Sequence, residues 1–123
     1  MLKTVAFYSG KKKLVASHYY ACHPMSYYGD GRVSADFCGL ARRRREQQDP
    51  GCVHLYFNGC GGNIGAGKYN NGSKKARVEL TQRMFQGMVE SETKITPRAP
   101  RNPGVGDPRY PAATEPRFRR RAS

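Results

Sequence analysis

The sequence predicts a small α+β (or α/β) domain followed by a disordered tail. Over residues 1–96, segments rich in β-branched and aromatic residues alternate with two segments whose apolar residues have helical spacing. Residues 97–123 contain six prolines and seven arginines and show neither period, so they cannot bury enough apolar surface to offset the entropy of ordering. A length of 123 residues leaves room for one domain, which we assign to residues 1–96.

The first predicted element is a β-hairpin. The runs LKTVAFY (2–8) and LVASHYYACH (14–23) are rich in strand-forming residues and flank the turn SGKK, in which Gly10 can adopt a positive φ. If the second strand is regular throughout, His18 and His23 point to opposite faces of it. These two histidines would then not bind the same metal ion.

A helix and a central strand are predicted next. Ser34 is a favourable N-cap for a helix over 34–48, and the sequence Asp49-Pro50-Gly51 ends that helix. The following segment VHLYF (53–57) is nearly all apolar, which is typical of a central strand.

A second helix is predicted over residues 73–91. Leu80, Met84 and Met88 lie on one stripe of this helix and would face the core. The segment TKIT (93–96) could then add a final strand. The predicted order is hairpin, helix, central strand, glycine-rich loop, helix and a possible last strand.

The charge and the cysteines limit the classes of function. A net charge of +13 favours binding to polyanions, either nucleic acid or an anionic membrane surface. The basic runs Lys11–Lys13 and Arg42–Arg45 carry no recognition-module signature, so solvated surface charge also explains them. Four cysteines without a C-x-x-C pair are expected to be free thiols. No signal peptide or apolar run of about 18 residues is present, so a cytoplasmic location is expected for the chain as written.

The stretch GCGGNIGAGKYNNG (59–72) has the G-x-x-x-x-G-K spacing of a phosphate-binding loop from Gly62 to Lys68. However, Tyr69 replaces the hydroxyl residue that would bind magnesium, and Asn70-Asn71-Gly72 delays the next helix. We therefore reject a nucleotide site. Six glycines in this stretch still allow the backbone to approach a ligand, and a flexible connection between two elements is the alternative.

His23 is the candidate site residue of the hairpin, because it stands at the end of a strand directly before Pro24. It could be a metal ligand or a general base, and a partly buried, hydrogen-bonded histidine is the alternative. We assign His54 a structural role. A zinc site built from Cys22, His23, His54 and Cys60 is disfavoured, since adjacent strand residues face opposite ways and the spacing matches no recognised ligand set.

Two segments together, ACHPMSYYGDGRVSADFCGLARR (21–43) and VHLYFNGCGGNIGAGKYNNGS (53–73), resemble the N-terminal domain of the neutral/alkaline (non-lysosomal) ceramidase family. The resemblance extends over residues 3–96. It implies hydrolysis of the amide of N-acylsphingosines, a ceramide-like lipid substrate and one zinc ion. By this resemblance His23 matches a zinc ligand, in the motif HP-x-S. Intact relatives are expected to be secreted or membrane-associated.

The glycine-rich stretch resembles the family segment that carries the nucleophilic serine. On that alignment Asn63 replaces an aspartate and Gly65 replaces the serine, so no catalytic residue carries over. The backbone of Gly61, Gly62, Asn63 and Gly65 would bind substrate or the developing oxyanion. The other zinc ligands of the family, a histidine upstream and a glutamate and a tyrosine downstream, have no counterpart here.

This resemblance implies a fragment of a zinc-dependent amidohydrolase domain, such as a truncated gene or a shifted reading frame would produce. Such a chain is expected to be inactive alone. The alternative is a small basic protein that binds nucleic acid or anionic lipid through its arginine-rich segments.

Overall fold

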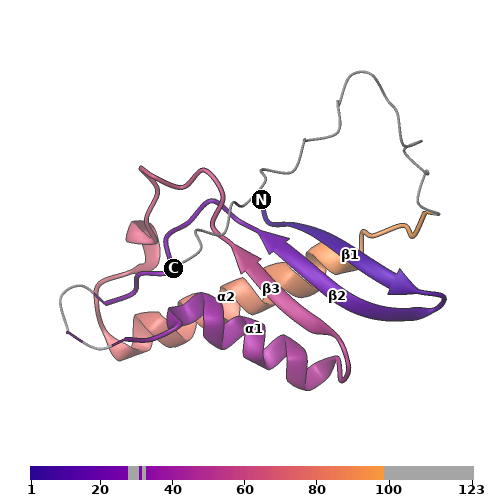
Figure 1. Cartoon of the computed structure of the whole chain (residues 1–123). Coiled ribbons are helices and arrows are strands. Elements are labelled where there is room, and N and C mark those ends of the chain that lie inside the picture. Colours follow the sequence, from indigo (N-terminus) through magenta and orange to yellow (C-terminus); the bar gives the residue numbers. More distant parts are fainter. Residues whose placement is uncertain (28–30, 32, 99–123) are drawn as a thin grey trace, which may run out of the picture.

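A computed structural model describes residues 1–27, 31 and 33–98 of the chain. Along the chain the elements are β1 (Lys3–Ser9), β2 (Lys12–Tyr19), α1 (Asp36–Gln48), β3 (Val53–Phe57), the short 3₁₀ helix η1 (Gly67–Tyr69) and α2 (Lys74–Glu92). Figure 1 shows this arrangement of a sheet and two helices, which confirms the predicted α+β class. The predicted tail lies almost entirely outside the described residues.

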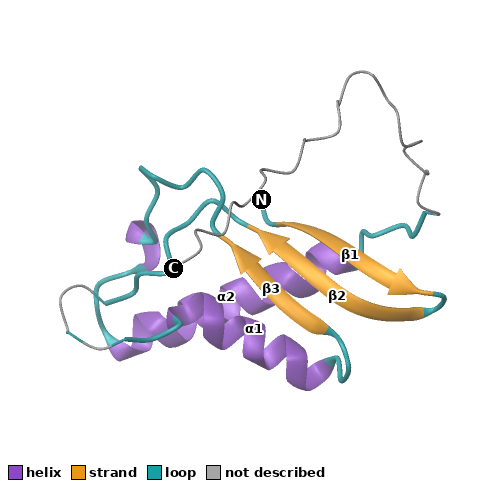
Figure 2. Ribbon diagram, in the orientation of Figure 1, coloured by secondary structure: helices purple, strands orange, loops and turns teal. Residues whose placement is uncertain are grey.

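The three strands form one sheet in the order β1-β2-β3. β1 and β2 are the predicted antiparallel hairpin, and Gly10 in its turn has the expected positive φ of 58°. β2 and β3 are parallel and are connected through α1. Both helices lie on the same side of the sheet, and no described helix lies on the other side (Figure 2).

The core lies between the sheet and the two helices. The predicted stripe of α2 faces it, and Met88 is completely buried. The buried apolar residues of this cluster come from both helices and from the loops at one end of the sheet: Leu2, Cys22, Phe37, Cys38, Ala41, Ala66, Leu80, Met84, Phe85 and Met88. All four cysteines are described and free, as predicted, and only Cys60 is exposed.

The two helices begin in different ways. Ser73, where the second helix is predicted to begin, is the N-cap of α2, and its Oγ accepts a hydrogen bond of 3.1 Å from the Ala76 N–H. α1 begins two residues later than predicted, at Asp36, and Ser34 Oγ accepts from the Asp36 N–H instead of capping the helix itself. Asp36 has a positive φ of 49°, which is uncommon for a residue other than glycine.

Three predictions of local structure are wrong. Among the described strands β3 is an edge strand and not a central one, so its apolar composition does not reflect cover on both sides. Residues 93–96 form no strand. β2 ends at Tyr19, so Cys22 and His23 follow the strand, and the argument from alternating strand faces does not apply to them.

Among the described helices, none combines the length and apolar composition that crossing a bilayer requires.

Candidate functional site

His23 lies in the loop after β2 and contacts the glycine-rich loop directly. Its main-chain N–H donates to the Ile64 carbonyl at 3.2 Å, and its ring Nδ1 lies 3.1 Å from the same oxygen. A carbonyl oxygen only accepts hydrogen bonds, so the ring proton is on Nδ1 and the lone pair of the neutral ring is on Nε2. The side chain is partly exposed. This is the orientation in which histidines commonly bind metal ions.

The glycine-rich loop reaches His23 because Gly61 allows a close backbone approach. A Cβ at Gly61 would lie 3.1 Å from the Asn58 carbonyl oxygen and 3.3 Å from the Cys22 nitrogen, which is too tight for most side chains. Gly61 is therefore buried, whereas Gly62, Asn63 and Gly65 are exposed. The structure thus brings together His23 and the predicted loop residues at one end of the sheet.

Two further side chains hold the His23 segment in place. Asp36 Oδ2 accepts from the Ser26 N–H at 2.9 Å, and Asp36 Oδ1 accepts from the Phe37 N–H at 2.6 Å, so one buried carboxylate joins this segment to α1. The Tyr56 hydroxyl donates to the Cys22 carbonyl at 2.7 Å. The positive φ of Asp36 is explained by these two hydrogen bonds, which fix its position.

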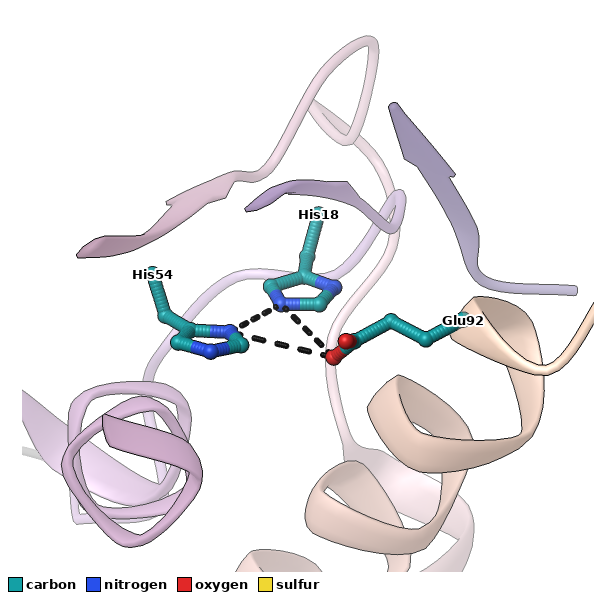
Figure 3. A group of neighbouring side chains, drawn as sticks. All are labelled: His18, His54 and Glu92. Atoms are coloured by element: carbon teal, nitrogen blue, oxygen red, sulfur yellow. Dashed lines mark hydrogen bonds and ion pairs between the residues drawn. The ribbon is translucent and has the colours of Figure 1, made fainter. Parts of the chain in front are cut away.

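A second cluster of titratable groups lies inside the domain, between the sheet and the C-terminal ends of both helices (Figure 3). A hydrogen bond of 2.9 Å joins His18 Nε2 and His54 Nδ1, and both rings are completely buried. Glu92 Oε1 lies 3.8 Å from each of these two nitrogen atoms. On its other side, His18 Nδ1 lies 2.8 Å from Thr4 Oγ1. The cluster joins β1, β2 and β3 to α2.

Cations neutralise the carboxylate of this cluster. Arg45 of α1 donates from Nε to Glu92 Oε1 and from Nη2 to Glu92 Oε2, both at 3.0 Å, and Lys13 of β2 also donates to Oε2. Burial alone would raise the pKa of the Glu92 carboxyl, but the hydrogen bonds from Arg45 and Lys13 outweigh burial and lower that pKa. Glu92 is therefore ionised and already paired at neutral pH.

The two histidines are neutral. Asp49 Oδ2 lies 3.4 Å from His54 Nε2, and a carboxylate can only accept, which places the His54 proton on Nε2. His54 Nδ1 then accepts from His18 Nε2. Burial lowers the pKa of His18 to about 4 and also lowers the pKa of His54. A second proton on His54 would occupy Nδ1 and face the N–H of His18 Nε2 across the 2.9 Å contact, so the hydrogen bond between the rings would be lost.

Two sets of side chains in the described residues could each offer three ligand atoms to a metal ion, all within 4.8 Å of one another: His18, His54 and Glu92, and Asp49, Cys52 and His54. His23 belongs to neither set. Both sets fit a divalent cation poorly. In the first set, Arg45 and Lys13 already neutralise Glu92 and would be repelled by the ion. In the second set, Lys13 already pairs with Asp49.

The His23 site lies at the carboxyl end of the parallel pair β2 and β3. His23 follows the carboxyl end of β2, and the glycine-rich loop follows the carboxyl end of β3. Binding sites of α/β folds usually lie at this end of the strands. The buried cluster extends along the strands, from Lys13 and His54 near their amino ends to His18, the second-last residue of β2. Its hydrogen bonds join residues of five elements, from which we infer a structural role.

Sequence reasoning missed the residues that position His23. Ile64 contributes a backbone carbonyl, which leaves no signal in the sequence, and the carboxylate of Asp36 binds Ser26, ten positions away. Lys68 of the rejected phosphate-loop pattern lies in η1, and α2 begins six residues after it, so no helix N-terminus faces the loop there.

No protein-family model, curated protein or solved structure matches the chain.

Proposed function

We propose that this chain supplies part of a zinc-dependent amidohydrolase site of the ceramidase type, with an N-acyl lipid amide as the substrate class. His23 is the proposed metal ligand, and the exposed backbone of Gly62, Asn63 and Gly65 is the proposed contact for the substrate carbonyl. The observation that supports this is the contact between His23 Nδ1 and the Ile64 carbonyl, which leaves Nε2 available beside the glycine-rich loop.

The residues present do not complete a zinc site at His23. A catalytic zinc ion takes about three protein ligands and keeps one open position, and no pair of further His, Cys, Asp or Glu ligands meets His23 among the described residues. Gly65 also stands where the resembling family has its nucleophile. We therefore expect the chain alone to bind zinc weakly and to hydrolyse nothing.

A zinc titration of the full chain, followed by NMR of the histidine rings, tests the ligand assignment. The chain has three histidines, so each Cε1–H signal can be assigned by substitution. Zinc should shift the His23 signal with weak affinity, because a single imidazole holds the ion. His23→Gln should remove this response, and His18→Gln is the matched control that should leave it unchanged.

Three outcomes decide the proposal. A response confined to His23, without fatty-acid release from an N-acylsphingosine, supports it. Zinc that shifts only His18 and His54 would assign the metal to the buried cluster and contradict the role of His23. Tight one-to-one zinc binding together with amide hydrolysis would contradict the incompleteness of the site.

A second candidate function is the binding of a polyanion on the helical side of the domain. The first turn of α2 contains Lys74, Lys75 and Arg77 and no acidic residue, although cations are unfavourable at a helix N-terminus. Arg44 of α1 lines the same groove as Lys74 and Arg77. An anion at this groove would relieve their mutual repulsion.

A labelled single-stranded oligonucleotide, titrated at several salt concentrations, tests this function. Affinity should fall steeply with added salt, and Lys74→Gln together with Arg77→Gln should weaken binding and reduce the salt dependence. Deletion of residues 99–123 separates the groove from the tail. If binding disappears on this deletion and is unchanged by the two substitutions, the polyanion binds the tail, and the proposed binding at the groove is wrong.

A further inference from the structure

The side of the sheet that faces away from the helices is apolar and uncovered. We call it the open face, and it consists of three residues from each strand: Lys3, Val5 and Phe7; Val15, Ser17 and Tyr19; and Val53, Leu55 and Phe57. The registers place these residues in three rows across the sheet. Seven of the nine are apolar or aromatic.

The open face is exposed to a degree that is unusual for such residues. Phe7 is 56 % exposed, Val53 51 % and Phe57 44 %, whereas His18 and His54 on the opposite face are completely buried. The Tyr19 and Phe57 rings stack on each other with centroids 5.1 Å apart, so they form one continuous apolar surface. Large exposed patches of this kind mark interaction sites in soluble proteins.

The apolar area of the open face can be estimated from its side chains. Three aromatic rings of about 200 Å² each, close to half exposed, and three half-exposed aliphatic side chains give roughly 450 Å². Two such faces together would remove roughly 900 Å² from water. Interfaces below about 1,200 Å² are weak and transient. This area fits a reversible dimer and not a permanent one.

The distribution of charge favours a second copy of the chain as the occupant. The chain carries +13, but Lys3, at one corner, is the only charged residue of the open face. Many exposed cations lie on the helices, such as Arg43 and Arg44 of α1 and Lys74 and Lys75 of α2, and the exposed Lys11 and Lys12 lie at the hairpin end of the sheet. If two sheets stack about 10 Å apart and each helical layer adds about as much, the cations of the helices lie roughly 30 Å apart, beyond the Debye length of about 8 Å.

The β3 edge of the sheet is partly blocked to a further strand, at His54. Both main-chain groups of His54 are occupied by side chains of α1, because Glu46 Oε1 accepts from the His54 N–H and Arg42 Nη1 donates to the His54 carbonyl, each at 3.3 Å. Arg42 and Glu46 also bind each other at 2.6 Å. Occupied edge groups disfavour association by strand addition at β3.

We propose that two copies of this chain associate through their open faces in an isologous, sandwich-like dimer. We expect a dissociation constant on the order of 10–100 µM, because interfaces of this size are generally weak. The dimer leaves His23 and the basic helical surface outside the interface. It is therefore independent of both functions proposed above.

Analytical ultracentrifugation of the full chain in reducing buffer tests this proposal, since the reductant keeps the exposed Cys60 from forming disulfides. Leu55→Lys places a like charge in the middle row of the open face and should weaken the dimer at least tenfold. Val78→Lys is the matched control, because Val78 is 70 % exposed on α2. Val5→Lys repeats the test on β1 in case Leu55→Lys does not fold, which circular dichroism checks.

A concentration-dependent dimer in the wild type and Val78→Lys, weakened in Leu55→Lys and Val5→Lys, supports the proposal. A monomer at every concentration up to about 300 µM overturns it. If the dissociation constant of the dimer is unchanged in both Leu55→Lys and Val5→Lys, the chains associate elsewhere, for example at the free edge of β1, and this result also overturns the proposal. Assemblies larger than the dimer contradict an isologous contact.

Discussion

Acidification should destabilise this domain through the buried histidine pair. The two rings share one hydrogen bond and are completely buried, so a second proton on His54 breaks that bond and a second proton on His18 places a charge out of contact with water. In the unfolded chain the same rings are hydrated and take up the proton freely near pH 6.5. Stability is therefore present above pH 6.5 and is lost as the pH falls toward the pKa of the folded state.

The magnitude follows from the pKa of His18, which is 6.5 in the reference state and about 4 in the folded state. Between pH 7 and pH 5 the unfolded state binds a proton on His18 that the folded state does not, which costs about 2 kcal/mol of stability. The full loss for His18, reached below pH 4, is about 3 kcal/mol. His54 contributes in the same direction because its pKa is also lowered, and the pair titrates jointly.

Urea denaturation of the full chain at pH 7, 6 and 5, followed by circular dichroism, measures this loss. His18→Gln keeps a buried side chain that can hydrogen-bond but cannot titrate, so it should reduce the difference between pH 7 and pH 5 by about 2 kcal/mol. His23→Gln is the matched control, since His23 lies outside the cluster and should leave the difference unchanged. Equal free energies of unfolding at pH 7 and pH 5, or the same pH dependence in His18→Gln, would refute the reasoning.

Three substitutions test other parts of the fold. Ser73→Ala removes the cap of α2 and should cost about 1 kcal/mol in urea denaturation; no loss would mean that the 3.1 Å bond to Ala76 contributes nothing. Glu92→Gln leaves Arg45 and Lys13 short of a counter-charge and should cost about 3 kcal/mol, whereas the exposed Glu90→Gln should be neutral. Gly61→Ala should cost about 1–3 kcal/mol and shift the amide signal of His23, because the new Cβ meets main-chain atoms at 3.1 and 3.3 Å; unchanged spectra would exclude this contact.

The sequence predicted those features that depend on local patterns. The hairpin with Gly10 at positive φ, the start of α2 near Ser73 and the buried stripe of α2 all follow from short-range preferences, and the structure confirms them. The start of α1 was missed because Ser34 was read as the cap. Its oxygen instead binds the N–H of Asp36, whose own carboxylate binds Ser26, a residue ten positions away. A contact of this kind leaves no local signal.

The environment of β3 could not be predicted because apolar composition does not say what covers a strand. VHLYF was interpreted as central, yet Val53, Leu55 and Phe57 face outward on an edge strand. The two polar-capable residues, His54 and Tyr56, face the helices and bind His18 and the Cys22 carbonyl. Apolar and polar residues therefore alternate along β3. In a typical half-covered strand the apolar residues face the core, whereas in β3 they face outward and the polar ones face the helices.

This reversal has a physical explanation that links the site to the fold. The sheet is small, and the layer between it and the two helices contains a hydrogen-bonded histidine pair, a carboxylate and two cations, so part of the interior is polar. Such a network stabilises only while every group is satisfied. The apolar residues of β3 lie on the other side, where they gain nothing until something covers them. If a second copy covers the open face, burying those residues should raise the free energy of unfolding with protein concentration. Thermal unfolding at low and high protein concentration measures this. The midpoint temperature should rise with concentration in the wild type and stay constant in Leu55→Lys. A midpoint of the wild type that does not change with concentration would contradict the explanation.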